Sequence, residues 1–159
     1  MAASTSELDL PSDGRFDPRC PFLGASVAVF RDGRVMLASR GRAPMEGLYS
    51  LPGGGVESGE TLAEAALREL REETGVEAEI IGFVAPVEVI ERDEAGRVRV
   101  HIVIAAHAAR WVAGEPRTGP EARDIRWIAE HEIDSLPTTP GLPGVLARAF
   151  ALARREGLA

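Results

Sequence analysis

One segment of the chain, Gly53 to Val76, constrains the fold and the chemistry more than any other. It reads GGGVESGETLAEAALRELREETGV and joins a glycine-rich turn to a stretch with helical periodicity. At about 100° per residue, one side of the helix carries Ala63, Ala66, Leu67, Leu70 and Thr74, whereas Glu69, Glu72 and Glu73 fall on a neighbouring side. The segment therefore predicts a helix with one face in the core and another that carries clustered carboxylates.

The carboxylate face points to a metal site. Like charges at spacings of three and four residues destabilise a helix by roughly 0.2–0.5 kcal/mol per pair, and a divalent cation removes that cost. Carboxylate oxygens suit Mg²⁺ or Mn²⁺, and Mg²⁺ usually binds through one or two carboxylates, several waters and substrate phosphates. An isolated cluster of this kind is more often a solvated helix face, so the wider pattern has to decide between the two interpretations.

The wider segment fits the pattern G-x5-E-x7-R-E-U-x-E-E-x-G-U, in which U is an aliphatic residue, at every specified position. The matching residues are Gly54, Glu60, Arg68, Glu69, Leu70, Glu72, Glu73, Gly75 and Val76. At ordinary residue frequencies, a chance fit is expected at on the order of one start position in a billion. The segment resembles a complete Nudix box, the signature of the Nudix hydrolases.

The resemblance implies an activity and a set of site residues. Nudix hydrolases cut a phosphoanhydride bond in a nucleoside diphosphate linked to another group, with the help of a divalent metal. The metal ligands implied here, for Mg²⁺ or Mn²⁺, are Glu69, Glu72 and Glu73 together with the carbonyl of Gly53. Arg68 is expected to orient the glutamates through ion pairs. The three glutamates and Arg68 are thus the expected catalytic residues of the box.

The ends of the box helix carry ordinary capping signals. Thr61 or Ser58 can serve as the N-cap, and Gly75 stands where a left-handed C-terminal cap is expected. The three glycines that follow Pro52 permit a backbone course that most side chains would forbid. Such a turn can bring a backbone carbonyl close to a metal ion.

The rest of the chain predicts an α/β fold. A hairpin is expected from residues 22–30 and 34–40, followed after the box by a strand over 76–91 with a break at Pro86. A long strand over 98–111, a polar loop, a short strand over 125–128 and a helix from about Leu142 complete the order. The resemblance implies an α/β/α sandwich with a mixed sheet between helices. Residues 1–21 are rich in Ser, Asp and Pro and lack periodicity, so we expect a flexible N-terminal arm followed by a single domain over residues 22–159.

Composition and net charge limit the kinds of binding partner that we expect. At 159 residues and 45% hydrophobic, the chain suits one domain, and a net charge of −7 argues against a nucleic-acid surface. The single cysteine, Cys20, cannot form an internal disulfide. The start of the chain has no secretory pattern, and no apolar run is long enough to span a membrane. We expect a cytoplasmic protein with a small-molecule nucleotide as partner, without nucleic acid or membrane, and a homodimer is left open.

Two residues outside the box are further candidates. Arg40 ends the second predicted strand. It is similar in position to an arginine with which some Nudix enzymes bind phosphate, and Arg42 is a weaker candidate for the same role. Glu121 lies in the polar loop before residues 125–128, and several Nudix enzymes are similar in supplying a glutamate from this loop. Such a residue can act as the base that activates water. The alternative for each is an ordinary solvated residue. Trp127 and Phe30 could stack on a base, but core packing is favoured for both.

The sequences that flank the box resemble the small ADP-ribose pyrophosphatase-type branch of the family. ADP-ribose or a similar nucleotide sugar is therefore the first substrate candidate. A proline that some ADP-ribose enzymes carry downstream of the box is absent here, where the chain reads Val89, Ile90 and Glu91. A nucleoside triphosphate pyrophosphohydrolase is the second candidate. A nucleotide-binding sensor without catalysis is the third, although sensors of this kind typically have damaged boxes.

Overall fold

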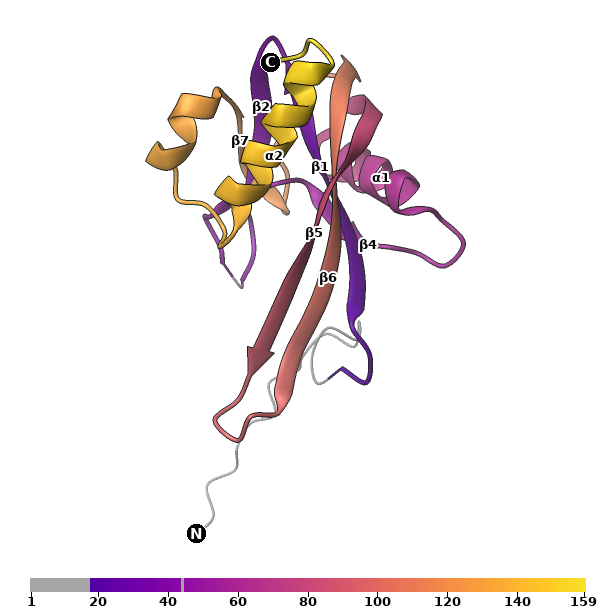
Figure 1. Cartoon of the computed structure of the whole chain (residues 1–159), viewed down its shortest axis with the longest axis vertical. Helices are drawn as coiled ribbons and strands as arrows, with labels where there is room; N and C mark the ends of the chain where they lie inside the picture. The colour runs from indigo at the N-terminus through magenta and orange to yellow at the C-terminus, as the bar shows by residue number, and fades with distance from the viewer. Residues whose placement is uncertain (1–17, 44) are drawn as a thin grey trace.

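The computed structural model describes residues 18–43 and 45–159. These residues form a mixed β-sheet between two helices (Figure 1). The elements are β1 (Phe22–Arg31), β2 (Arg34–Arg40), β3 (Tyr49–Ser50), β4 (Gly53–Gly55), α1 (Leu62–Thr74), β5 (Glu77–Arg92), β6 (Val98–Ala113), β7 (Ala122–Ile128), the 3₁₀ helix η1 (Glu130–Ser135) and α2 (Leu142–Arg155). The predicted arm over residues 1–21 lies mostly outside the described residues.

The sheet is organised around β1. Its strands follow the order β3-β2-β1-β6-β5, with β4 paired to β1 and β7 paired to β2. β1 and β6 run parallel, while the other pairs are antiparallel. The antiparallel pair of β1 with β4 carries the glycine turn of the box into the sheet, against α1.

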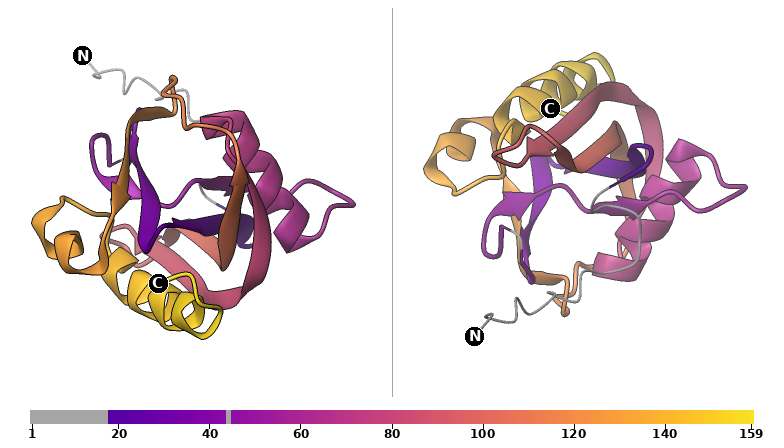
Figure 2. Two further views of the ribbon diagram at one scale, coloured as in Figure 1. Left: turned by 90° about the horizontal axis from the view of Figure 1, so that it is seen from above. Right: turned by 90° about the horizontal axis from the view of Figure 1, so that it is seen from below.

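The two faces of β1 bury two separate cores, because successive side chains of a strand point to opposite faces. Ala28 and Phe30 pack in the core that includes α2, and the ring of Phe30 meets that of Phe150 edge-on at 5.0 Å between centroids. Val27 and Val29 pack in the core that includes α1. Figure 2 shows the two helices on opposite sides of the sheet. The predicted α/β/α sandwich is confirmed, and Phe30 is a core residue.

The caps of α1 follow the sequence signals. Of the two N-cap candidates, Thr61 is the cap: its hydroxyl accepts the backbone N–H of Glu64 at 3.2 Å, and the Glu64 carboxylate accepts the N–H of Thr61 at 2.7 Å. This reciprocal pair satisfies two backbone donors at the helix start. Gly75 ends the helix with φ of +75°, as a left-handed cap requires. The predicted helix from Leu142 is also confirmed as α2.

The predicted break at Pro86 is wrong. β5 continues through this residue, which lies opposite Ala105 in the ladder with β6. β5 is the last strand in the sheet order, so the missing N–H of proline can face the open edge without loss of a ladder bond. Register shifts on the Glu77 side of Pro86 bend the strand. The uninterrupted β5 and β6 form a long hairpin that projects beyond the helices (Figure 1).

Other differences concern short elements. The predicted strand over residues 125–128 begins earlier, at Ala122, because it pairs with β2 as far as Arg40. The two-residue strand β3, the three-residue strand β4 and helix η1 have no sequence pattern long enough to predict them. Among the residues that the structure describes, no helix has the length and apolar character needed to cross a membrane.

Candidate active site

The glycine turn is held against the sheet by two backbone bonds. The N–H of Val27 donates to the carbonyl of Pro52 at 3.1 Å, and the N–H of Val56 donates to the carbonyl of Leu23 at 3.0 Å. Between these bonds, the residues of β4 alternate in the direction of their backbone groups. Gly54 lies opposite Ala25 of β1. The backbone groups of its two glycine neighbours are therefore left for other partners.

Those neighbouring glycines are bound by side chains of α1. The N–H of Gly53 donates to Oε2 of Glu73 at 3.3 Å, and the carbonyl of Gly55 accepts Nη2 of Arg68 at 2.9 Å. A residue in a strand turns its N–H and its carbonyl to the same side, so the Gly53 carbonyl faces the same side as the Glu73 carboxylate. Polar contacts thus join the glycine turn to α1.

A glycine is required at position 54 because the Glu69 side chain of α1 approaches the backbone closely there. A Cβ at this position would lie 2.4 Å from the carboxylate carbon of Glu69 and 2.5 Å from its Oε1. No side chain fits there unless Glu69 moves. The box pattern therefore specifies glycine at position 54 because the carboxylate of Glu69, also specified by the pattern, occupies the space of a side chain.

Arg68 is the centre of an ion-pair network. It binds Glu60 in bidentate fashion, from Nε to Oε2 at 3.0 Å and from Nη2 to Oε1 at 2.6 Å. Its Nη1 donates to Glu69 at 2.8 Å and to Glu72 at 3.3 Å. The bonds from Arg68 hold the pKa of Glu60 well below its usual range, at about 2. Bonds to Glu60 and Glu69 raise the pKa of Arg68 in turn. Arg68 therefore fixes two of the three expected metal ligands.

The third expected ligand, Glu73, accepts the N–H of Gly53 and is half-buried. Burial is the largest cause that raises its pKa, to about 8. The Gly53 N–H and the charge of Arg40 oppose this rise, while the charges of Glu69 and Glu121 add to it. Arg40 and Glu121 come from the ends of other elements, so the fold brings both close enough to act on Glu73.

A pocket of about 510 Å³ opens at the end of α1. It is bordered by the last turn of that helix, by the residue that follows Gly41 and by the loop between β6 and β7. Its lining residues are Arg42, Arg71, Glu72, Glu73, Thr74, Gly75, Arg117, Thr118, Gly119, Pro120 and Glu121. The structure thus places Glu121 in one pocket with two glutamates of the box, and places Arg42 at the same pocket.

The carboxylates are gathered but not yet converged on one point. Within residues 18–43 and 45–159, no group of three or more histidine, cysteine, aspartate or glutamate side chains is already arranged to hold a metal ion. Glu69 and Glu72 are turned toward Arg68, and Glu73 is turned toward Gly53. Side-chain rotation would be needed to bring their oxygens together. The donors are carboxylates and a carbonyl, which are the oxygen ligands that Mg²⁺ prefers.

Trp127 has a structural role. It lies on β7, half-buried against the core that includes α1. The guanidinium of Arg31 lies 5.9 Å from its ring centroid and 4.2 Å from that of Trp111. Cation–π contact and core packing account for this tryptophan, in agreement with the interpretation that the sequence favoured.

Sequence reasoning missed Arg71 and Arg117, which line the pocket, and the carbonyl of Gly55, which holds Arg68. Arg71 occupies an unspecified position of the box pattern, and Arg117 stands in a polar loop without periodicity. Their proximity depends on how the loop folds back on the helix. The only sequence signal for these arginines was the presence of charged residues at and near positions that the box pattern does not specify.

A family model, described as the NUDIX domain, matches residues 21–149. The chain belongs to the Nudix family. Members of this family generally use divalent metal ions and act on small nucleotide substrates. The intact box of this Nudix chain, from Gly54 to Val76, lies wholly within the matched region.

Three known proteins illustrate the likeness. The ADP-ribose pyrophosphatase of Methanocaldococcus jannaschii is 28% identical over 117 residues, which are 74% of this chain and 65% of the relative. The CTP pyrophosphohydrolase of Escherichia coli is 40% identical over 78 residues, 48% of this chain and 55% of the relative. The crystal structure of a MutT NUDIX hydrolase from Burkholderia pseudomallei superposes with a TM-score of 0.66 and 30% identity, over 82% of this chain and 98% of that chain. The two sequence matches span less than two thirds of the relatives' length.

Proposed function

We propose that this Nudix chain hydrolyses a phosphoanhydride bond in a nucleoside diphosphate linked to another group, with the help of a divalent metal. The observation that carries the proposal is the intact box geometry. Arg68 binds Glu60, Glu69 and Glu72, while Glu73 is held beside the glycine turn at the edge of an open pocket. In this proposal, residues 22–159 act as one catalytic domain, and its partner is a small nucleotide in a cytoplasmic setting.

Mg²⁺ or Mn²⁺ would be held by Glu69, Glu72, Glu73 and the carbonyl of Gly53. The fit rests on electrostatics: a half-buried carboxylate whose pKa is raised by burial and by neighbouring carboxylates is the kind of group that a cation stabilises in its charged form. When bound, such an ion supplies charge neutralisation for phosphate oxygens and makes a bound water more acidic.

The remaining steps fall to the chain's own side chains. We assign Glu121 as the general base, because it lines the same pocket as Glu72 and Glu73 and its backbone is fixed by the bond from the Gly41 N–H to its carbonyl at 3.0 Å. The oxygen of a water attacks a phosphorus, and its proton passes to the Glu121 carboxylate. The bridging P–O bond breaks, and the leaving phosphate keeps the electron pair. Arg40, whose charge acts on Glu73, would bind a substrate phosphate oxygen.

ADP-ribose, or a similar nucleotide sugar, is the first substrate candidate. It is supported by the resemblance of the sequences around the box and by the ADP-ribose pyrophosphatase that aligns with 74% of the chain. A nucleoside triphosphate is the second candidate, because the CTP pyrophosphohydrolase shares 40% identity over its shorter match. The complete set of box carboxylates argues against a sensor that binds nucleotide without cleavage.

A substrate panel tests the proposal. Purified protein with Mg²⁺ is incubated with ADP-ribose, NADH, dinucleoside polyphosphates and nucleoside triphosphates, and the nucleotide products are separated. Release of a mononucleotide from ADP-ribose or a related compound is the expected result. Cleavage confined to the triphosphates would select the second candidate. Binding of nucleotides without any product would overturn the enzymatic proposal in favour of a sensor.

Replacing Arg68 by alanine is expected to lower kcat or metal affinity by about 10- to 100-fold, since Glu69 and Glu72 lose the group that orients them. Steady-state kinetics at a series of Mg²⁺ concentrations measure both quantities. The matched control is Arg110→Ala, which removes an exposed arginine paired with Glu79 outside the site. A change confined to substrate KM would contradict the orienting role and indicate that Arg68 contacts phosphate directly.

A further inference from the structure

Three arginines from separate segments meet at the pocket that holds the box glutamates. Arg42 follows β2, Arg71 lies in the last turn of α1, and Arg117 lies in the loop between β6 and β7. All three are exposed. Among the residues that the structure describes, none of their guanidinium groups has an ion-pair or hydrogen-bond partner, in contrast to Arg68 and Arg110.

The position of Arg117 is fixed by the end of α1. Its backbone N–H donates to the carbonyl of Thr74 at 2.9 Å. Its guanidinium lies over Gly75, where a Cβ would come within 3.1 Å of Nη2 and 3.2 Å of Nε. The carbonyl end of a helix favours a cation. Arg117 is therefore held beside the last turn that also carries Glu72 and Glu73.

The position of Arg42 is fixed by its neighbour. The N–H of Gly41 donates to the carbonyl of Glu121 at 3.0 Å, and a Cβ at Gly41 would lie only 2.0 Å from the carbonyl oxygen of Pro120. A glycine is needed for this approach, and it is buried. The contact ties the segment that carries Arg42 to the loop that carries Glu121.

The pocket is thus lined by charges of both signs. Glu72, Glu73 and Glu121 supply the negative charges, and the three arginines supply the positive charges. Three cations that share one pocket repel each other, and an anion between them relieves that repulsion. Guanidinium groups match phosphate oxygens through paired N–H donors, which makes arginine the usual choice for phosphate recognition. None of the described lining residues is aromatic, so this pocket suits phosphate better than a nucleobase.

We propose that Arg42, Arg71 and Arg117 form an arginine wall that binds the second phosphate of the substrate, the one beyond the phosphate at the carboxylates. This inference rests on the proposed function and names the binding site for the distal phosphate of that reaction. It applies to the second phosphate of a nucleotide sugar and to the next phosphate of a nucleoside triphosphate alike. Binding of a diphosphate across the pocket would place the scissile bond between the wall and the glutamates.

The test compares AMP with ADP, which differ by one phosphate. Affinities are measured by calorimetry with Ca²⁺ in place of Mg²⁺, since Ca²⁺ also takes oxygen ligands. We expect the unmodified protein to bind ADP more tightly than AMP. Arg71→Gln and Arg117→Gln are each expected to weaken ADP about tenfold, as for the loss of a charge-assisted hydrogen bond, and to change AMP less than about twofold. Arg117→Lys, which keeps the charge, is expected to fall between.

The control is Arg148→Gln, which removes the same charge from α2 outside the pocket, and it should leave both affinities unchanged. An equal loss of AMP and ADP affinity would overturn the assignment, because the wall would then hold the first phosphate. Unchanged ADP affinity in both glutamine variants would also overturn it. Because binding is measured without turnover, a failure of this inference is distinct from a failure to find hydrolysis in the substrate panel.

Discussion

Replacing Glu73 by glutamine is expected to lower kcat by at least about 10²-fold, the scale seen when a preorganised electrostatic group is removed from an active site. Glu73 is a half-buried carboxylate of the site, with its pKa raised to about 8 mainly by burial. Glutamine has nearly the same shape and can still accept the N–H of Gly53, so the fold should survive. The loss would then report the missing charge. Steady-state kinetics and a thermal melt of the same sample measure both.

Two comparisons sharpen this result. Glu72→Gln removes the neighbouring carboxylate, which is more exposed and contacts Arg68, and a loss of similar size is expected. Glu77→Gln removes the same charge from the exposed start of β5 and should leave the rate unchanged. Near-normal rates in both the Glu72 and Glu73 variants would show that the acidic face of α1 is only a solvated surface.

Glu121→Gln is expected to lower kcat by about 10²- to 10⁴-fold, the contribution of a general base, and to leave KM nearly unchanged. Glutamates that bind a cation lose basicity, so the proton acceptor should be a different group. Glu121 is the only carboxylate between Glu115 and Asp124 in the chain, and it lines the pocket beside Glu72 and Glu73. Kinetics at saturating Mg²⁺ and substrate isolate the effect on kcat.

The matched control is Glu115→Gln. This residue belongs to the same loop, but its carboxylate binds Arg31 at 2.8 Å instead of lining the pocket. Its loss should leave kcat unchanged. A decrease below about threefold in the Glu121 variant, far under the range of general bases, would reject Glu121 and leave a glutamate of the box as the base.

The box could be predicted from the sequence because its interactions are local. Glu69, Glu72 and Glu73 lie within one and a half turns of a single helix, so spacing alone places them together. The caps at Thr61 and Gly75 are equally local. The alternation of β1 between two cores follows from the two-residue period of a strand, whereas the sandwich was predicted from the resemblance to the Nudix hydrolases.

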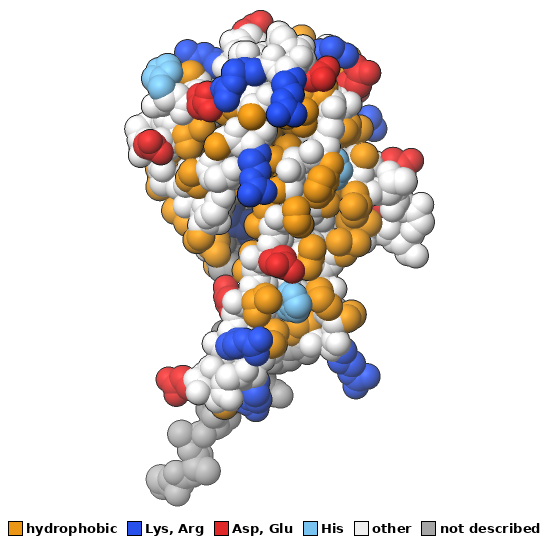
Figure 3. Space-filling view, in the orientation of Figure 1, with side chains coloured by type: hydrophobic (Ala, Val, Ile, Leu, Met, Phe, Trp, Pro, Cys, Tyr) orange, Lys and Arg blue, Asp and Glu red, His pale blue; other side chains and the backbone are white. Residues whose placement is uncertain are grey.

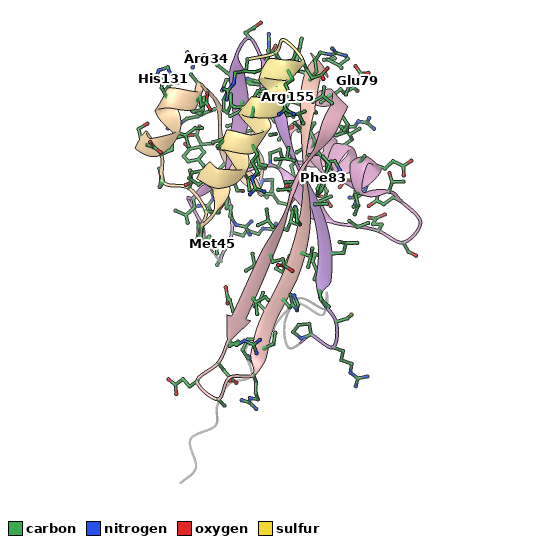
Figure 4. The ribbon with its side chains drawn as sticks, viewed as in Figure 1. Arg34, Met45, Glu79, Phe83, His131 and Arg155 are labelled. Atoms are coloured by element: carbon green, nitrogen blue, oxygen red, sulfur yellow. The ribbon has the colours of Figure 1, made fainter. Side chains whose placement is uncertain are left out.

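The strand through Pro86 could not be predicted, because its tolerance depends on position in the sheet. Only the order of strands shows that β5 is at an edge, where the missing N–H of a proline costs no ladder bond. The arrangement of strands and helices in the fold also decides which apolar side chains of the β5–β6 hairpin are exposed to solvent. Apolar side chains gather on the face shown in Figure 3, and Phe83 of β5, which is labelled in Figure 4, is an example because 55% of it is exposed. A strand pattern read from sequence treats such residues as core.

The arginine wall also could not be predicted from the sequence. Its members are separated by up to 75 positions in number, from Arg42 to Arg117, and each belongs to a different element. Their meeting depends on two backbone bonds, from Gly41 to Glu121 and from Arg117 to Thr74. Neither bond leaves a periodic or compositional pattern. Residues brought together by loop-to-helix contacts of this kind become visible only in the fold.

The dependence of turnover on metal tests the central claim most directly. The best substrate of the panel is assayed with Mg²⁺, with Mn²⁺, and with a chelator in excess over all divalent ions, followed by addition of Mg²⁺ beyond the chelator. The clustered carboxylates of α1 repel a pyrophosphate unless a cation lies between them, so activity should fall to the uncatalysed rate in chelator and return in full with Mg²⁺. Undiminished turnover in excess chelator would contradict the account.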